Sequence, residues 1–131
     1  MPRPFKLSLT SEPSEAKKLH NELQAWLLEF GINGAIGHDI LLATNEAFLN
    51  AIEDSQEHVT RLIAISAQVA ERDVVIHLHR PAQQRRPQVD ASPGRHSQSL
   101  LTALMNNVRI DRHQNGTSIT LRKTLDRVPP D

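Results

Sequence analysis

The spacing of apolar residues changes from two to three or four along the chain and then back to two, and this change limits the possible folds most. Phe5, Leu7 and Leu9 alternate with polar residues, which is typical of a half-buried strand. After Pro13, apolar residues recur at three- and four-residue steps as far as Gly31. This spacing predicts a helix with one apolar stripe, and Pro13 is well tolerated in its first turn.

A second helix is expected to begin at His38 and Asp39, after a connection over residues 31–37 that contains three glycines. Its apolar residues cover more than one face, which indicates a central and largely buried helix. These residues are Ile40, Leu41, Ala43, Ala47, Phe48, Ala51 and Ile52.

The second half of the chain begins with a predicted β-hairpin. Apolar residues alternate over 62–69 and again over 74–79, and residues 71–73 form the turn between them. Residues 80–96 contain three prolines and almost nothing apolar, which predicts a long mobile loop. Ser97 is suited to cap a third helix, and two last strands are expected to meet at Asn115 and Gly116.

The order of these elements is strand, helix, helix, strand, strand, loop, helix, strand, strand. Strand pairs separated by helices favour an α/β (α+β) two-layer sandwich, with a mixed, mostly antiparallel sheet and helices on one face. A chain of 131 residues fits one domain, so we expect residues 1–131 to form it.

Composition excludes several classes of protein. The chain has 15 basic and 15 acidic residues, so no whole-domain field favours nucleic acid or an anionic membrane. It has no cysteine, which excludes disulfides, thiolate zinc sites and a cysteine nucleophile. No apolar stretch approaches the roughly 20 residues of a membrane span. We therefore expect a cytoplasmic protein.

Three polar side chains follow one another on a single face of the second predicted helix. Glu46 and Asn50 are four residues apart, and Asp54 extends the line by another turn. A carboxylate and a carboxamide on an otherwise apolar helix need polar partners. Mg²⁺ would bind the Asn50 oxygen, while Glu46 could deprotonate a water or a hydroxyl. The competing interpretation is a solvated helix edge.

The segment 45–52, Asn-Glu-Ala-Phe-Leu-Asn-Ala-Ile, resembles the N box of the GHKL ATPase superfamily, in the form seen in anti-sigma factors that are also serine protein kinases. The order of strands and helices over nearly the whole chain is also similar to this family. The resemblance implies a Bergerat-type ATP-binding fold with ATP and Mg²⁺ as cofactors. It also implies that Glu46 is the general base, that Asn50 binds magnesium, and that Thr117 lies at the adenine pocket.

The chain departs from this family at the glycine-rich boxes. The family has Asp-x-Gly-x-Gly after the third strand, where the Asp accepts a hydrogen bond from the adenine amine. Strand alternation puts Arg80 at the Asp position, or His79 if the strand shifts by one residue. Arginine has donors and no acceptor, so Arg80 cannot receive that amine. Asp73 or Asp90 remains as a substitute acceptor.

The second glycine box is also altered, because Ser97 stands where its last glycine belongs. Arg95 and the start of the third helix are still suited to contact phosphates.

Two other clusters have both a functional and a simpler interpretation. His77 and His79 share a strand face and could bind a metal with His96 or Asp90, although exposed strand histidines are ordinary. A basic cluster in and beside the loop could instead contact nucleic acid. Its members are Arg80, Arg85, Arg86, Arg95 and His96.

The resemblance predicts a partner-switching regulator of transcription that binds a sigma factor, a STAS-type antagonist protein, or both. One alternative is a serine/threonine protein kinase that uses Mg-ATP on the antagonist, and another is a degenerate interaction module that does not bind ATP productively. A nucleic-acid binder is the alternative of another class. A homodimer through the first strand and first helix is a further expectation from the resemblance.

Overall fold

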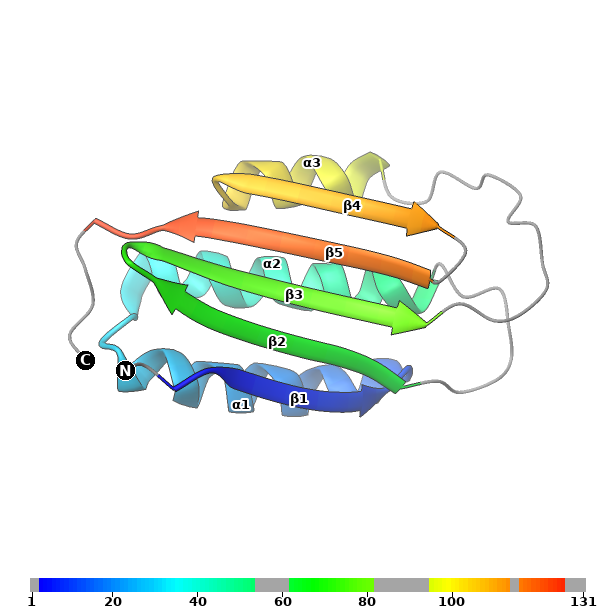
Figure 1. Ribbon diagram of the computed structural model, residues 1–131, viewed down its shortest axis with the longest axis horizontal. Helices are drawn as coiled ribbons and strands as arrows, with labels where there is room; N and C mark the ends of the chain where they lie inside the picture. Colours follow the sequence, from blue (N-terminus) through cyan, green and yellow to red (C-terminus); the bar gives the residue numbers. More distant parts are fainter. Residues whose placement is uncertain (1–2, 54–61, 82–94, 114–115, 127–131) are drawn as a thin grey trace.

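The computed structural model describes residues 3–53, 62–81, 95–113 and 116–126 (Figure 1). Three α-helices and five strands follow the predicted order. The elements are β1 (Phe5–Thr10), the short 3-10 helix η1 (Pro13–Glu15), α1 (Ala16–Glu29), α2 (Gly34–Glu53), β2 (Leu62–Ala70), β3 (Asp73–Pro81), α3 (Arg95–Leu104), β4 (Asn107–His113) and β5 (Gly116–Thr124).

The five strands form one sheet in the order β1-β2-β3-β5-β4, and all four pairings are antiparallel. The three helices lie together on one face of this sheet (Figure 1). The predicted two-layer α+β sandwich is therefore confirmed. The described sheet contains no parallel pair, so it is antiparallel throughout and not mixed.

The core lies between the sheet and the helix layer. Alternate residues of β3, namely Val74, Ile76 and Leu78, point into it and are buried. Helix α2 is central and largely buried, as predicted, and Phe48 is fully enclosed. None of the described helices is long and apolar enough to cross a membrane.

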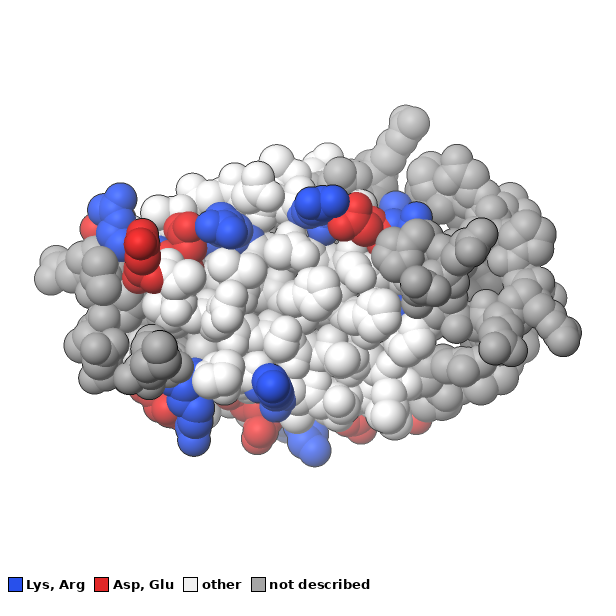
Figure 2. Space-filling model, viewed as in Figure 1, with Lys and Arg blue, Asp and Glu red and all other residues white. Residues whose placement is uncertain are grey.

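The opposite face of the sheet is open, and its middle carries no charged lysine, arginine, aspartate or glutamate side chain (Figure 2). His77 and His79 lie on this face, where their Nδ1 atoms are each 3.0 Å from a hydroxyl oxygen of Thr120 and Ser118, respectively. Among the described residues, no group of three or more potential ligands forms a metal site.

The structure corrects three predicted boundaries. Helix α2 begins at Gly34, not at His38, so Gly37 lies in its first turn. A Cβ atom at Gly37 would lie 3.3 Å from the carbonyl oxygen of Ile32, so a glycine there lets the incoming chain pack closely. Ser97 is the third residue of α3 and not its cap, because α3 begins at Arg95. Strand β3 continues to Pro81, so Arg80 belongs to the sheet and not to the loop.

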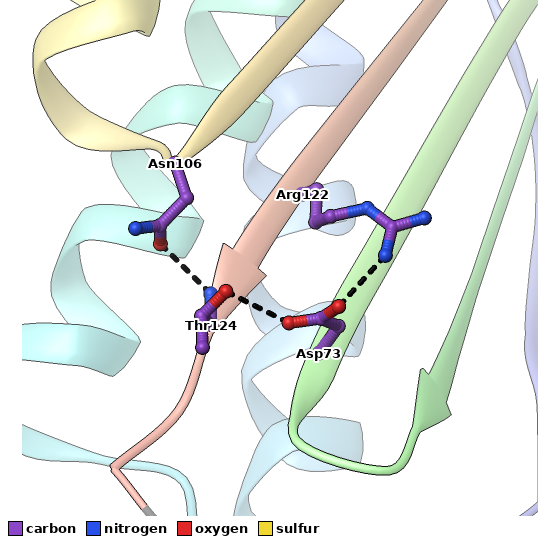
Figure 3. A network of polar contacts seen from close by, with 4 residues as sticks. All are labelled: Asp73, Asn106, Arg122 and Thr124. Carbon is purple, nitrogen blue, oxygen red and sulfur yellow. Dashed lines mark hydrogen bonds and ion pairs between the residues drawn. The ribbon is translucent and has the colours of Figure 1, made fainter.

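A polar network ties together one end of the molecule (Figure 3). Asp73, at the start of β3, accepts hydrogen bonds from Arg122 Nη1 at 2.7 Å and from Thr124 Oγ1 at 2.8 Å. The backbone N–H of Thr124 donates in turn to the side-chain oxygen of Asn106 at 2.8 Å. These contacts join the β2–β3 turn, the end of β5 and the corner between α3 and β4.

Candidate functional site

The candidate site begins on α2. Glu46 and Asn50 are both half-buried and lie one turn apart, on a helix whose intervening residues Ala47 and Phe48 are fully buried. The helix packs on β3 and β5 through its apolar side. Glu46 and Asn50 therefore lie at the edge of the buried face of α2, where they stay partly accessible to solvent. Asp54, which extends the same line, lies outside the described residues.

The second part of the site is a cross-strand pair at the junction of β3 and β5. Arg80 and Thr117 are register partners, and both face the core side of the sheet. Their side chains are buried, with 4% of Arg80 and 3% of Thr117 exposed. Arg80 Nη2 donates to Thr117 Oγ1 at 3.4 Å.

The register shows that Arg80 continues the inward series of β3, while His79 faces the other side of the sheet. The expectation that Arg80 stands where the resemblance implies an adenine acceptor therefore concerns a core-facing side chain. Arg80 is 96% buried, so it is not part of a solvent-exposed basic cluster of the kind that binds nucleic acid.

The end of α2, the end of β3 and the beginnings of α3 and β5 all lie at the same end of the molecule (Figure 1). Glu46 and Asn50 lie on α2, and Thr117 is the second residue of β5, which begins at this end. Arg95 and Ser97 lie in the first turn of α3 at this end, and their side chains lie outside the described part of the structure.

The residues present fit one part of Mg-ATP and not the other. The Asn50 carboxamide is a hard oxygen ligand of the kind that Mg²⁺ prefers, and Glu46 is an ionisable group beside it. The adenine end does not fit, because a buried guanidinium offers only donors where the adenine amine needs an acceptor.

Asp73 does not replace the missing acceptor. It stands at the opposite end of β3 from Arg80, about 23 Å away at the rise of an extended strand. Hydrogen bonds from Thr124 and then Arg122 lower the pKa of Asp73, so its carboxylate is engaged within the network described above. Asp90, the other candidate acceptor, lies outside the described residues.

Sequence reasoning missed a cation that connects the helix layer to the sheet. Lys123 Nζ donates to the carbonyl oxygen of Leu104 at 2.6 Å and lies 3.2 Å from Asp39 Oδ2. A signal was present, because Lys123 continues the inward series of Ile119 and Leu121 on β5. It joins the end of α3, the first part of α2 and the sheet.

The described part of the chain thus has an antiparallel sheet covered on one face by helices, with the Glu46–Asn50 line on the central helix. The chain belongs to the family of histidine kinase-like ATPase domains, whose pattern matches residues 9–123. No match was found among curated proteins.

Among solved structures, the chain is similar to that of the RsbU and RsbW domains of Rv1364c from Mycobacterium tuberculosis. The TM-score is 0.76 at 23% sequence identity, and the alignment covers 98% of this chain and 33% of the other. The likeness shows that the fold is shared, and this chain spans about a third of the length of that structure.

Proposed function

We propose that this chain is a cytoplasmic partner-switching regulator, which binds a sigma factor or a STAS-type antagonist through protein contacts that do not depend on adenine recognition. The family membership and the similarity to a structure that includes an RsbW domain support a regulator of this kind. The observation that carries the second half of the proposal is the burial of Arg80, which the resemblance puts at the position of the adenine acceptor.

The physical argument rests on hydrogen-bond chemistry. An adenine amine that faces a guanidinium meets only donors from that group, and it loses its bonds to water without replacement by them. A buried donor left without an acceptor costs about 1–3 kcal/mol, which is up to a hundredfold in affinity. Mg-ATP binding in the usual manner is therefore weakened.

A second candidate function is favoured by the Glu46–Asn50 line. Both groups of the metal-binding half are present one turn apart on α2. In this candidate, the chain is a serine/threonine kinase: Glu46 takes the proton of a serine hydroxyl on the antagonist, and Asn50 supplies an oxygen ligand to Mg²⁺.

The deciding experiment measures the affinity of the purified chain for sigma factors and STAS-type antagonists of its own organism, with and without Mg-ATP. Biolayer interferometry is suitable because both states are measured on one immobilised sample. We expect at least one partner to bind with a Kd of about 1 μM or tighter, and Mg-ATP to leave that Kd unchanged within about twofold.

The same samples test the kinase candidate with ATP labelled on its terminal phosphate. Transfer of label to the antagonist, lost in Glu46→Gln, would establish the kinase and overturn the adenine-independent proposal. The absence of binding to every such partner would overturn the regulatory role itself.

A further inference from the structure

A hollow lies in the seam between α1 and α2, and neither Arg80 nor Thr117 lines it. It has a volume of about 390 Å³ and is open to solvent. This size falls at the lower end of the range for ligand pockets, roughly 300–1,000 Å³. One wall is formed by residues of α1 between 16 and 21, and the other by residues of α2 between 38 and 45.

The groove exists because polar residues replace apolar ones along this seam. On α2, His38, Leu41, Leu42 and Asn45 follow the spacing i, i+3, i+4, i+7 of a single helix face. Such a face normally packs fully against its neighbour, yet His38 is exposed, Leu42 and Asn45 are only half-buried, and Leu41 alone is buried. Of these four residues, the helices therefore fully cover only Leu41, and the other three stay accessible to solvent in the groove.

The charges at the groove have one sign. Lys17 and His20 on α1 and His38 on α2 line it, and all three are exposed. Among the described residues that line the groove, none is acidic. A lysine ammonium has three donors, and each imidazole offers an N–H donor in either protonation state. Counted as in the formal net charge of zero, with histidine neutral, the groove carries the positive charge of Lys17 and no negative charge from its described lining residues.

The groove also has an apolar floor, which Leu41 and Leu42 provide between the polar rims. A small inorganic anion would leave this floor exposed, whereas a peptide segment with a carboxylate next to an apolar side chain would cover both features.

We propose that the α1–α2 groove binds an acidic segment of a partner protein, with a carboxylate against Lys17, His20 and His38 and an apolar side chain on Leu41 and Leu42. The inference rests on the proposed function, which supplies the partner, and adds the surface that receives it. The groove adjoins the candidate site, since Asn45 lines it and Glu46 is the next residue of α2.

The test is a titration of the ¹⁵N-labelled full chain, followed by amide chemical shifts. The probe is a short capped peptide of repeated Asp-Leu-Glu, and the reference peptide is its uncharged counterpart, Asn-Leu-Gln. We expect the acidic peptide to shift the amides of residues 16–21 and 38–45 and to bind more tightly than the uncharged one. Lys17→Glu should weaken this binding about threefold to tenfold.

Lys18→Glu is the matched control, because Lys18 is also exposed on α1 but does not line the groove. Equal weakening by the two variants, equal binding of the two peptides, or no shifts at these amides would overturn the proposal. So would identical shifts with sodium acetate, which would indicate a small-anion site, or tighter binding of a single-stranded oligonucleotide at the same residues. The probe is a peptide and neither a sigma factor nor an antagonist. The peptide titration can therefore succeed or fail independently of the binding experiment that tests the proposed function.

Discussion

At the scale of single residues, Arg80 distinguishes this chain most from the ATP-binding pattern that it resembles. Its neighbours in the inward series of β3 are Val74, Ile76 and Leu78, all buried in the core. A guanidinium at the end of such a series is costly to desolvate unless it is held by polar partners. The hydroxyl of Thr117 is one such partner.

Replacement of Arg80 by aspartate should restore an acceptor at this position. We expect Arg80→Asp to bind Mg-ATP at least about tenfold more tightly than the wild type, because a charge-assisted hydrogen bond to the adenine amine becomes available. Isothermal titration calorimetry with ATP and Mg²⁺ measures this directly.

Arg80→Leu tests whether the gain in affinity comes from the new acceptor or only from removal of the guanidinium, since it removes the guanidinium and adds no acceptor. If Arg80→Leu gains as much affinity as Arg80→Asp, the acceptor is not the cause. Tight binding of Mg-ATP by the wild type would contradict the prediction outright. Circular dichroism and thermal unfolding of each variant show whether it has kept the fold.

Asp73 is the residue whose charge state is coupled to stability. Its pKa is lowered by hydrogen bonds from Thr124 and Arg122, below the ordinary value of about 3.9. A lowered pKa stabilises the folded state above the unfolded-state pKa, and the contribution is lost as pH falls through the folded value. Asp73→Asn should therefore be less stable than the wild type above about pH 4, and the difference should shrink below it.

Urea unfolding at a series of pH values between neutral and acidic checks this expectation. Asp126 provides the control, because it is exposed near the same end of the molecule. An equal pH-dependent difference in Asp126→Asn would show that the effect is not specific to the Asp73 network. A constant difference between wild type and Asp73→Asn across the whole range would show that shape and not charge is responsible.

At the scale of elements, the end of α1 depends on one backbone conformation. Gly31 has φ of +70°, its N–H donates to the carbonyl of Leu28, and the N–H of Ile32 donates to that of Leu27. This pattern is a Schellman motif, and the burial of Ile32 and Leu27 supplies its usual apolar contact. The motif turns the chain towards α2.

Gly31→Ala should lower the free energy of unfolding by about 1 kcal/mol, because an L residue with a Cβ is strained at positive φ. No atom outside the adjacent residues lies within 4 Å of a Cβ placed at Gly31, so backbone strain and not crowding is tested. Urea denaturation gives the value. Gly31→Asn should lose less, since asparagine tolerates this conformation better, and an equal or greater loss would argue against the assignment.

At the scale of the whole molecule, Lys123 couples the two layers. It contacts Asp39 on α2 and the last carbonyl of α3 from its place on β5, and its side chain is only 16% exposed. Helix α3 begins at the end of the molecule where the candidate site lies (Figure 1). Lys123 bonds to the last residue of α3 and to Asp39 on α2, so it helps to hold α3 against α2.

Lys123→Met should reduce the free energy of unfolding by about 1–3 kcal/mol, because it leaves a partly buried carboxylate and a carbonyl without their donor. Amide hydrogen exchange should accelerate in α3 more than in β2. The control is Arg109→Met, which removes an exposed ion pair with Asp111 and should change stability by less than about 1 kcal/mol. Comparable losses from the two variants would show that Lys123 has no special role in joining the layers.

The layered fold was predictable because burial imposes a period on each element. Phe5, Leu7 and Leu9, and the inward residues of β3, show the period of a strand, while Leu19, Leu23 and Trp26 show that of a helix. The start of α2 was not predictable in the same way. Glycines usually interrupt helices, and α2 includes both Gly34 and Gly37; the close approach of Ile32 to Gly37 gives the reason for the second of them.

The sequence by itself determined the order of the elements, the Glu46–Asn50 line and the absence of the Asp-x-Gly-x-Gly box, because each depends on local spacing or residue identity. Only the tertiary structure decided that Arg80 and not His79 faces the core against Thr117, since a shift of one residue in strand register exchanges the two faces. It also decided that Asp73 is far from that position and that Lys17, His20 and His38 share a groove. Contacts between residues distant in sequence arise from the packing of whole elements, and no local pattern carries that information.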